Sequence, residues 1–190
     1  SVIENLDPVV AIIAPHAGYP YSGPTAAHAY KQLEGKSYRT VIVLAPSHAE
    51  SFPGASVFDG DAYETPLGRI TVNQEIASRL TEGSDELYLS EMGHHTRGHR
   101  AEHSLEVQLP FLQMVLEPDF DIVPTVIHDY RLETLQAIGT RLAQVLDDNT
   151  LIIASSDLYH GYSYEDCQQS DSRTLKAIES FDAESFLQGI

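Results

Sequence analysis

Four short apolar runs, rich in β-branched residues, constrain the fold more than any other feature of the chain. They cover Val9–Ala14, Thr40–Ala45, Ile122–Ile127 and Leu151–Ala154. Their length and composition are those of buried β-strands. Because the apolarity is continuous rather than alternating, we expect both faces of the sheet to be covered, which is typical of a parallel sheet.

Segments with helical periodicity separate these runs. We expect helices over residues 24–34, 102–117, 132–146 and 164–180. The first should begin at Pro24 after a cap at Ser22 or Gly23 and end at Gly35. The second carries leucines on one stripe, with Pro110 as a kink. Alternating strands and helices predict an α/β fold: a layered sandwich with a mainly parallel central sheet flanked by helices.

We expect residues 1–190 to form a single domain, because no repeat or linker interrupts the pattern. The segment from Glu82 to Arg100 has little periodicity and predicts a long surface loop. Loops of that length in compact domains are usually functional or mobile.

The charge of the chain limits its partners. Eleven basic and 28 acidic residues leave a formal net charge of −17, which repels phosphate backbones and anionic membrane surfaces. No apolar run approaches the roughly 20 residues of a membrane span. The single cysteine, Cys167, excludes an internal disulfide and is compatible with a reducing compartment. We expect a cytoplasmic protein that binds a small molecule or a peptide, and neither nucleic acid nor membrane.

Histidines follow three of the four expected strands. His16 follows the first run, His48 the second and His160 the fourth. Because the carboxyl ends of parallel strands share one edge, where ligands bind, we expect the three imidazoles to converge. Imidazole both binds metals and moves protons near neutral pH. Asp157 lies close enough in sequence to orient His160. The alternative is that His16 and His48 only cap turns.

A glycine-rich segment, residues 16–24, follows the first run. Glycine lets backbone approach a ligand closely, and Tyr19 and Tyr21 offer aromatic walls and hydroxyls. The segment also fits an ordinary turn between a strand and a helix. We assign Tyr19, Tyr21, Ser47 and Glu106 to substrate binding.

A second histidine cluster precedes the expected second helix. His99 and His103 are four residues apart, and the order His-x-x-Glu-His is the inverted zinc-protease signature, although His99 falls in the expected loop. His103, with Glu102 and Glu106, either reaches the cleft or pairs on the helix surface.

The remaining histidines receive less specific interpretations. We expect His94 and His95 to be solvated in the loop and His28 to pack against the sheet. His128, which follows a strand without a turn motif, should be structural.

Motifs spread over nearly the whole chain resemble those of the Memo family, which includes component B of the AmmeMemoRadiSam system. They occupy residues 14–23, 26–30, 44–48, 63–68, 102–112 and 155–160, in family order. The resemblance implies a fold similar to the class III extradiol dioxygenases. Similarity of fold does not transfer their reaction.

The resemblance also implies roles for individual residues. It places His16 and His48 at metal-ligand positions, His160 at the position of a catalytic base, and Asp157 and His103 nearby in the cleft. We assign His160, Asp157 and His103 to catalysis. Iron or copper is the metal it implies.

Two family features are missing from the sequence. It lacks the Gly-x-Phe-Tyr-Pro segment near the amino terminus and the Cys-Gly motif that carries a third ligand, and Cys167 does not match that cysteine. We therefore expect a longer parent protein.

The leading hypothesis is a redox enzyme with non-haem iron or copper, similar to dioxygenases, acting on an unknown small molecule. One alternative is a zinc-dependent hydrolase that uses the same histidines to activate water. The other is a scaffold without enzymatic activity that binds a peptide or another partner.

Overall fold

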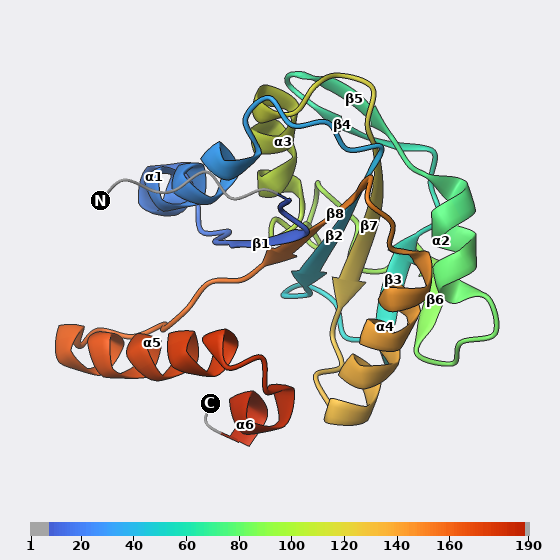
Figure 1. The fold of residues 1–190 in the computed structure, drawn as a ribbon. Helices are drawn as coiled ribbons and strands as arrows, with labels where there is room; N and C mark the ends of the chain where they lie inside the picture. The colour runs from blue at the N-terminus through green and yellow to red at the C-terminus, as the bar shows by residue number, and fades with distance from the viewer. Residues whose placement is uncertain (1–7, 189–190) are drawn as a thin grey trace. The chain divides into compact units, whose positions relative to one another are not determined.

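A six-stranded sheet forms the centre of the larger of two compact units into which the computed structural model divides (Figure 1). The structure describes residues 8–188. The strand order is β1 (Ala11–Ala14), β8 (Thr150–Ser155), β2 (Thr40–Pro46), β7 (Asp121–Ile127), β3 (Ala55–Phe58) and β6 (Leu87–Ser90). The first four are parallel, β3 is antiparallel to β7, and β6 is parallel to β3. The predicted α/β fold with a mainly parallel sheet is confirmed.

All four predicted strands are present and lie next to one another in the sheet. The sequence did not predict β3 and β6, which are only four residues long. Such short runs carry too little periodicity to separate them from loops. The expectation of a continuous loop from Glu82 to Arg100 is wrong, because β6 lies within that segment.

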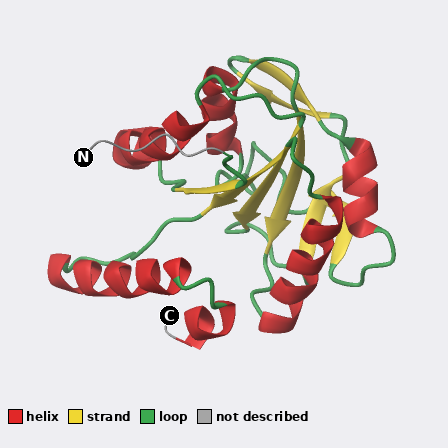
Figure 2. Cartoon of the chain, in the orientation of Figure 1, coloured by secondary structure: helices red, strands yellow, loops and turns green. Residues whose placement is uncertain are grey.

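Helices cover both faces of the sheet, as Figure 2 shows in red against the yellow strands. Along β2, Val41 and Val43 point into the core shared with α1 (Tyr19–Tyr30) and α3 (Leu109–Val115). Ile42, between them, points into the core shared with α2 (Gln74–Thr81) and α4 (Leu132–Val145). Each fully buried aliphatic side chain of this kind contributes about 1.5–3 kcal/mol.

Helix α1 begins five residues earlier than the sequence predicted, at Tyr19 instead of Pro24. Pro20 occupies the first turn, where its missing N–H costs nothing, and Pro24 lies inside the helix. A 3₁₀ turn, Lys31–Leu33, extends the helix. The predicted end at Gly35 agrees with its left-handed backbone, φ 71°.

The predicted helix over residues 102–117 is shorter than expected. A 3₁₀ turn, Glu106–Gln108, leads into α3, and Pro110 lies in the first turn of α3 rather than at a kink. Residues 102–105 are not helical, because the Glu102 carboxylate accepts hydrogen bonds from the backbone N–H groups of His103 and Ser104. Local bonds of this kind compete with the helix.

Three further elements of the first unit were not predicted. A hairpin of β4 (Ala62–Thr65) and β5 (Gly68–Thr71) precedes α2. The Asn73 side chain caps α2 by accepting a hydrogen bond from the Ile76 N–H. The predicted helix over residues 132–146 is confirmed as α4.

The first unit ends at Ser156, and the second begins at Asp157. The second unit contains α5 (Tyr164–Glu179), which confirms the helix predicted there, and α6 (Ala183–Gln188). Ser163 caps α5 by accepting from the Asp166 N–H. Among the described residues, no helix has both the length and the apolarity needed to cross a membrane.

Candidate metal centre

His16 and His48 lie together at the carboxyl end of the sheet. Each follows its strand, β1 or β2, by two residues. Their ring centroids are 5.3 Å apart, with the rings at 71° to each other. The structure thus brings together two of the three histidines that the strand pattern predicted to converge.

His103 is the third imidazole of this cluster. Its ring centroid lies 5.8 Å from that of His16 and 5.0 Å from that of His48. His16 is buried, at 4% exposure, whereas the His48 and His103 side chains are 48% and 51% exposed. The cluster is therefore open to solvent on the side of His48 and His103.

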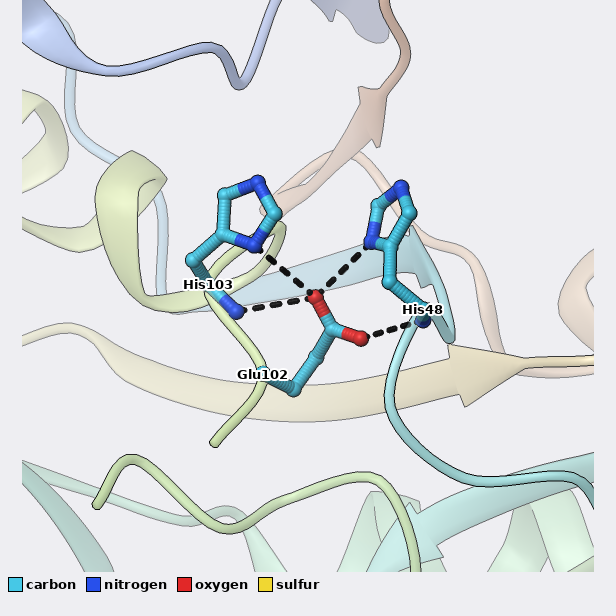
Figure 3. A group of neighbouring side chains, drawn as sticks. All are labelled: His48, Glu102 and His103. Carbon is cyan, nitrogen blue, oxygen red and sulfur yellow. Dashed lines mark hydrogen bonds and ion pairs between the residues drawn. The ribbon is translucent and has the colours of Figure 1, made fainter. Parts of the chain in front are cut away.

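A buried carboxylate, Glu102, lies between His48 and His103 (Figure 3). Its Oε1 accepts a hydrogen bond from Nδ1 of His48 at 3.0 Å and lies 3.4 Å from Nδ1 of His103. Oε1 also accepts from the backbone N–H groups of His103 and Ser104, at 2.8 and 3.0 Å. Oε2 accepts from the backbone N–H groups of His48 and Ala49.

Glu102 is charged at neutral pH despite its burial. Burial alone would raise the pKa of its carboxyl group. The hydrogen bonds from Ser104, His48 and His103 outweigh burial and lower the pKa to about 2. The site therefore contains a fixed negative charge that faces two imidazoles.

A buried polar network lies behind His16. The Ser155 hydroxyl donates to the Ser104 carbonyl at 2.6 Å and accepts from the Gln108 amide at 2.8 Å. Because its only hydrogen goes to Ser104, the hydroxyl accepts from His16 Nδ1, 2.9 Å away. The Tyr30 hydroxyl donates to Gln108 Oε1 at 2.6 Å. His16 therefore carries its proton on Nδ1 and a lone pair on Nε2.

Sequence reasoning did not identify Ser155, Gln108 or Tyr30 as parts of the site. All three are buried. Gln108, which lies between Leu105 and Leu109, was the available sequence signal for this network. A buried amide requires hydrogen-bond partners.

Two of the residues predicted to bind substrate, Tyr19 and Glu106, line a hollow of about 390 Å³ with Glu64 and Leu67. The Tyr19 hydroxyl donates to the Val107 carbonyl at 3.1 Å. Burial raises the pKa of Tyr19, and the Glu106 charge raises it further. Burial also raises the pKa of Glu106. This hollow can accept a small molecule.

The other two residues predicted to bind substrate, Tyr21 and Ser47, have different surroundings. Tyr21 is 85% exposed. The Ser47 hydroxyl donates to the Glu50 carbonyl at 2.6 Å and shapes the turn after β2. Substrate binding by either residue stays a prediction.

Asp157 and His160 belong to the second unit. His160 Nδ1 donates to the Leu158 carbonyl at 2.7 Å, and its Nε2 lies 3.6 Å from an Asp157 carboxylate oxygen. The 3.6 Å separation of Nε2 from the carboxylate is within the range of an ion pair and longer than a hydrogen bond. Its part in catalysis stays a prediction.

The structure corrects the interpretation of His94. Instead of being solvated, it is 7% exposed and bridges the Tyr63 hydroxyl, 2.7 Å from Nδ1, and the Ser56 carbonyl, 3.0 Å from Nε2. Since the carbonyl only accepts, Nε2 carries the proton and Nδ1 accepts from Tyr63. Burial lowers the pKa of His94 to about 4.

One further histidine interpretation is wrong. His28 is exposed on α1 and does not pack against the sheet. His99 lies outside any helix, as expected, and so do residues 100–103. The helical histidine pair of the inverted zinc-protease signature is therefore absent from this segment.

These features define an α/β protein with a histidine cluster at the carboxyl edge of a mainly parallel sheet. The family model described as "Memo-like protein" matches residues 3–190, and the chain belongs to the Memo-like family.

Similar proteins carry the description "MEMO1 family protein". Those of Nitrosopumilus maritimus and Aeropyrum pernix are 35% and 39% identical to the chain over 97% and 95% of its length. That of Methanopyrus kandleri is 36% identical over 90% of the chain. The chain spans 60–66% of the length of these three relatives.

Proposed function

We propose that this protein is a metal-dependent oxidoreductase in which His16 and His48 hold a non-haem iron or copper ion. The observation that carries the proposal is the 5.3 Å separation of the two rings, which follow the carboxyl ends of β1 and β2 on either side of β8. Ligands bind at this edge in parallel α/β proteins.

The donor chemistry of the cluster fits this group of metals. Imidazole nitrogens suit iron, copper, nickel and zinc, whereas magnesium and calcium prefer oxygen. Nδ1 of His16 lies against Ser155, and Nδ1 of His48 lies against Glu102. Buried partners of this kind fix the tautomer of a metal-binding histidine and leave Nε2 as its ligand atom.

A bound iron or copper ion would supply one-electron chemistry and Lewis acidity. The chain itself orients the ligands through Ser155 and Glu102. Tyr19 and Glu106 would hold a small substrate in the hollow that they line. We assign proton transfer to His160, whose ring already donates through Nδ1 to a carbonyl.

Elemental analysis combined with oxygen uptake tests this function. We expect stoichiometric iron or copper in the protein, oxygen consumption with a suitable reductant or substrate, and loss of both in His16→Ala and His48→Ala. His99→Ala, which changes an exposed histidine four residues before His103, is the matched control. Metal-free protein without oxygen uptake would refute the proposal. Stoichiometric zinc with turnover of esters would favour the hydrolase instead.

A further inference from the structure

We propose that His103 is a third nitrogen ligand of this metal and that Glu102 is the residue that positions His103 and His48 together. This inference rests on the proposed function. It gives His103 a role in binding the metal rather than in handling protons.

The spacing of the three rings supports a shared metal. Their centroids are 5.0, 5.3 and 5.8 Å apart. Three imidazoles bound to one tetrahedral ion through bonds of about 2.0–2.1 Å have centroids roughly 5 Å apart. The ring centroids are therefore spaced as a common ion would space them, and ligand atoms of His48, Glu102 and His103 lie within 4.8 Å of one another.

The orientation of two of the rings supports it as well. Nδ1 of His48 and Nδ1 of His103 both face Oε1 of Glu102, at 3.0 and 3.4 Å. In Figure 3 the second nitrogen of each ring, Nε2, points away from the carboxylate and toward the same side. The carboxylate thus orients both rings so that their Nε2 atoms face the side of the cluster away from Glu102.

Glu102 is close enough to the two histidines to be mistaken for a ligand itself. Its two oxygens, however, accept five hydrogen bonds, four of them from backbone N–H groups. A carboxylate offers about four lone-pair sites, so these donors saturate it. We therefore infer that Glu102 acts through the histidines and does not bind the ion.

The backbone contacts explain how Glu102 fixes the positions of both the His48 and the His103 rings. Oε2 holds the loop after β2 through the N–H groups of His48 and Ala49. Oε1 holds the segment before α3 through the N–H groups of His103 and Ser104. Glutamine at position 102 would turn an NH₂ group toward some of these donors and loosen both loops. Loss of such a supporting carboxylate typically weakens metal binding 10–100-fold.

Copper(II) alone is a sufficient probe, because paramagnetic resonance counts the nitrogens coupled to the ion and chelator competition gives its affinity. We expect three coupled imidazole nitrogens in the wild-type chain. His103→Ala should leave two and lower the affinity on the order of a hundredfold, since it removes a ligand and not only its support. Because His103 is half-exposed, this variant should fold.

Two further variants complete the experiment. Glu102→Gln should keep three nitrogens but lower the affinity about 10–100-fold. His99→Ala, the control from the same segment, should match the wild type. Thermal melts report folding, and if Glu102→Gln is unfolded, Glu102→Asp, which keeps the charge on a shorter side chain, takes its place.

The failure of this inference differs from the failure of the proposed function. Copper bound through only two imidazoles, with His103→Ala unchanged in affinity and nitrogen count, would overturn the role of His103 and leave the proposed function standing. Affinity within twofold of wild type in a folded Glu102 variant would overturn the positioning role. A wild-type chain that binds neither copper nor iron would overturn both proposals.

Discussion

Tyr30→Phe should destabilise the protein although it removes a single oxygen. The Tyr30 side chain is 1% exposed, and its hydroxyl donates at 2.6 Å to Oε1 of Gln108. Gln108 is itself fully buried, so no solvent replaces the lost donor. The amide that supports Ser155, and through it His16, would keep an unsatisfied oxygen.

The magnitude follows from the burial of the orphaned group. Leaving one buried acceptor without a donor costs about 1–3 kcal/mol. In a chain of 190 residues each 1 kcal/mol shifts the melting temperature by about 2–4 °C. We therefore expect the melting temperature to fall by several degrees and the urea midpoint to move to a lower concentration.

Tyr88→Phe is the matched control, because the Tyr88 hydroxyl also donates one hydrogen bond, to the Pro53 carbonyl at 2.8 Å, but at an exposed position. Water replaces that donor, so the free energy of unfolding should change by at most about 0.5 kcal/mol. Urea denaturation of both variants decides the matter. Equal stability of Tyr30→Phe and Tyr88→Phe would refute the reasoning.

Three further predictions concern acid, metal and packing. The pKa of His94, about 4, lies below its ordinary value of 6.5, so its contribution to stability is complete above pH 6.5 and is lost as pH falls through 4. His94→Gln should therefore lose less free energy of unfolding than the wild type between about pH 7 and about pH 4.5, as urea titrations would measure; an identical loss would contradict this. Added copper(II) should raise the melting temperature of the wild type, and removal by chelator should reverse the shift, whereas the shift should be smaller in His48→Ala; an equal response would mean binding elsewhere. Leu109→Ala, at a fully buried position, should cost about 2–5 kcal/mol in urea unfolding, and a loss under 1 kcal/mol would show that the site collapses.

The central strands could be predicted because each is a short, continuous apolar run that can be recognised from the local sequence alone. The run from Val41 to Leu44 is apolar on both faces, and the structure buries Val43 in one core and Ile42 in the other. A strand buried on both faces belongs in the middle of a sheet. The shared edge then followed from the parallel arrangement, and with it the meeting of His16 and His48.

Other parts of the fold depend on contacts that no local pattern reveals. Pro20 and Pro24 both fit the first turn of a helix, and the start is set at Gly18, whose carbonyl accepts from the Tyr21 and Ser22 N–H groups. The segment before α3 reads as helix, but the Glu102 side chain binds its own neighbouring N–H groups and a loop distant in sequence. His103 consequently points into the cluster from a loop rather than from a helix face.

The three imidazoles differ in exposure, so the cluster has a solvent-exposed side and a buried side. His16 is held on the buried side by its hydrogen bond to Ser155, while His48 and His103 lie at the surface on two loops. An ion would arrive and depart past the loop histidines. Changes in those loops should then alter how fast metal exchanges, whereas changes to Ser155 or Gln108 should alter how firmly the His16 ring is held.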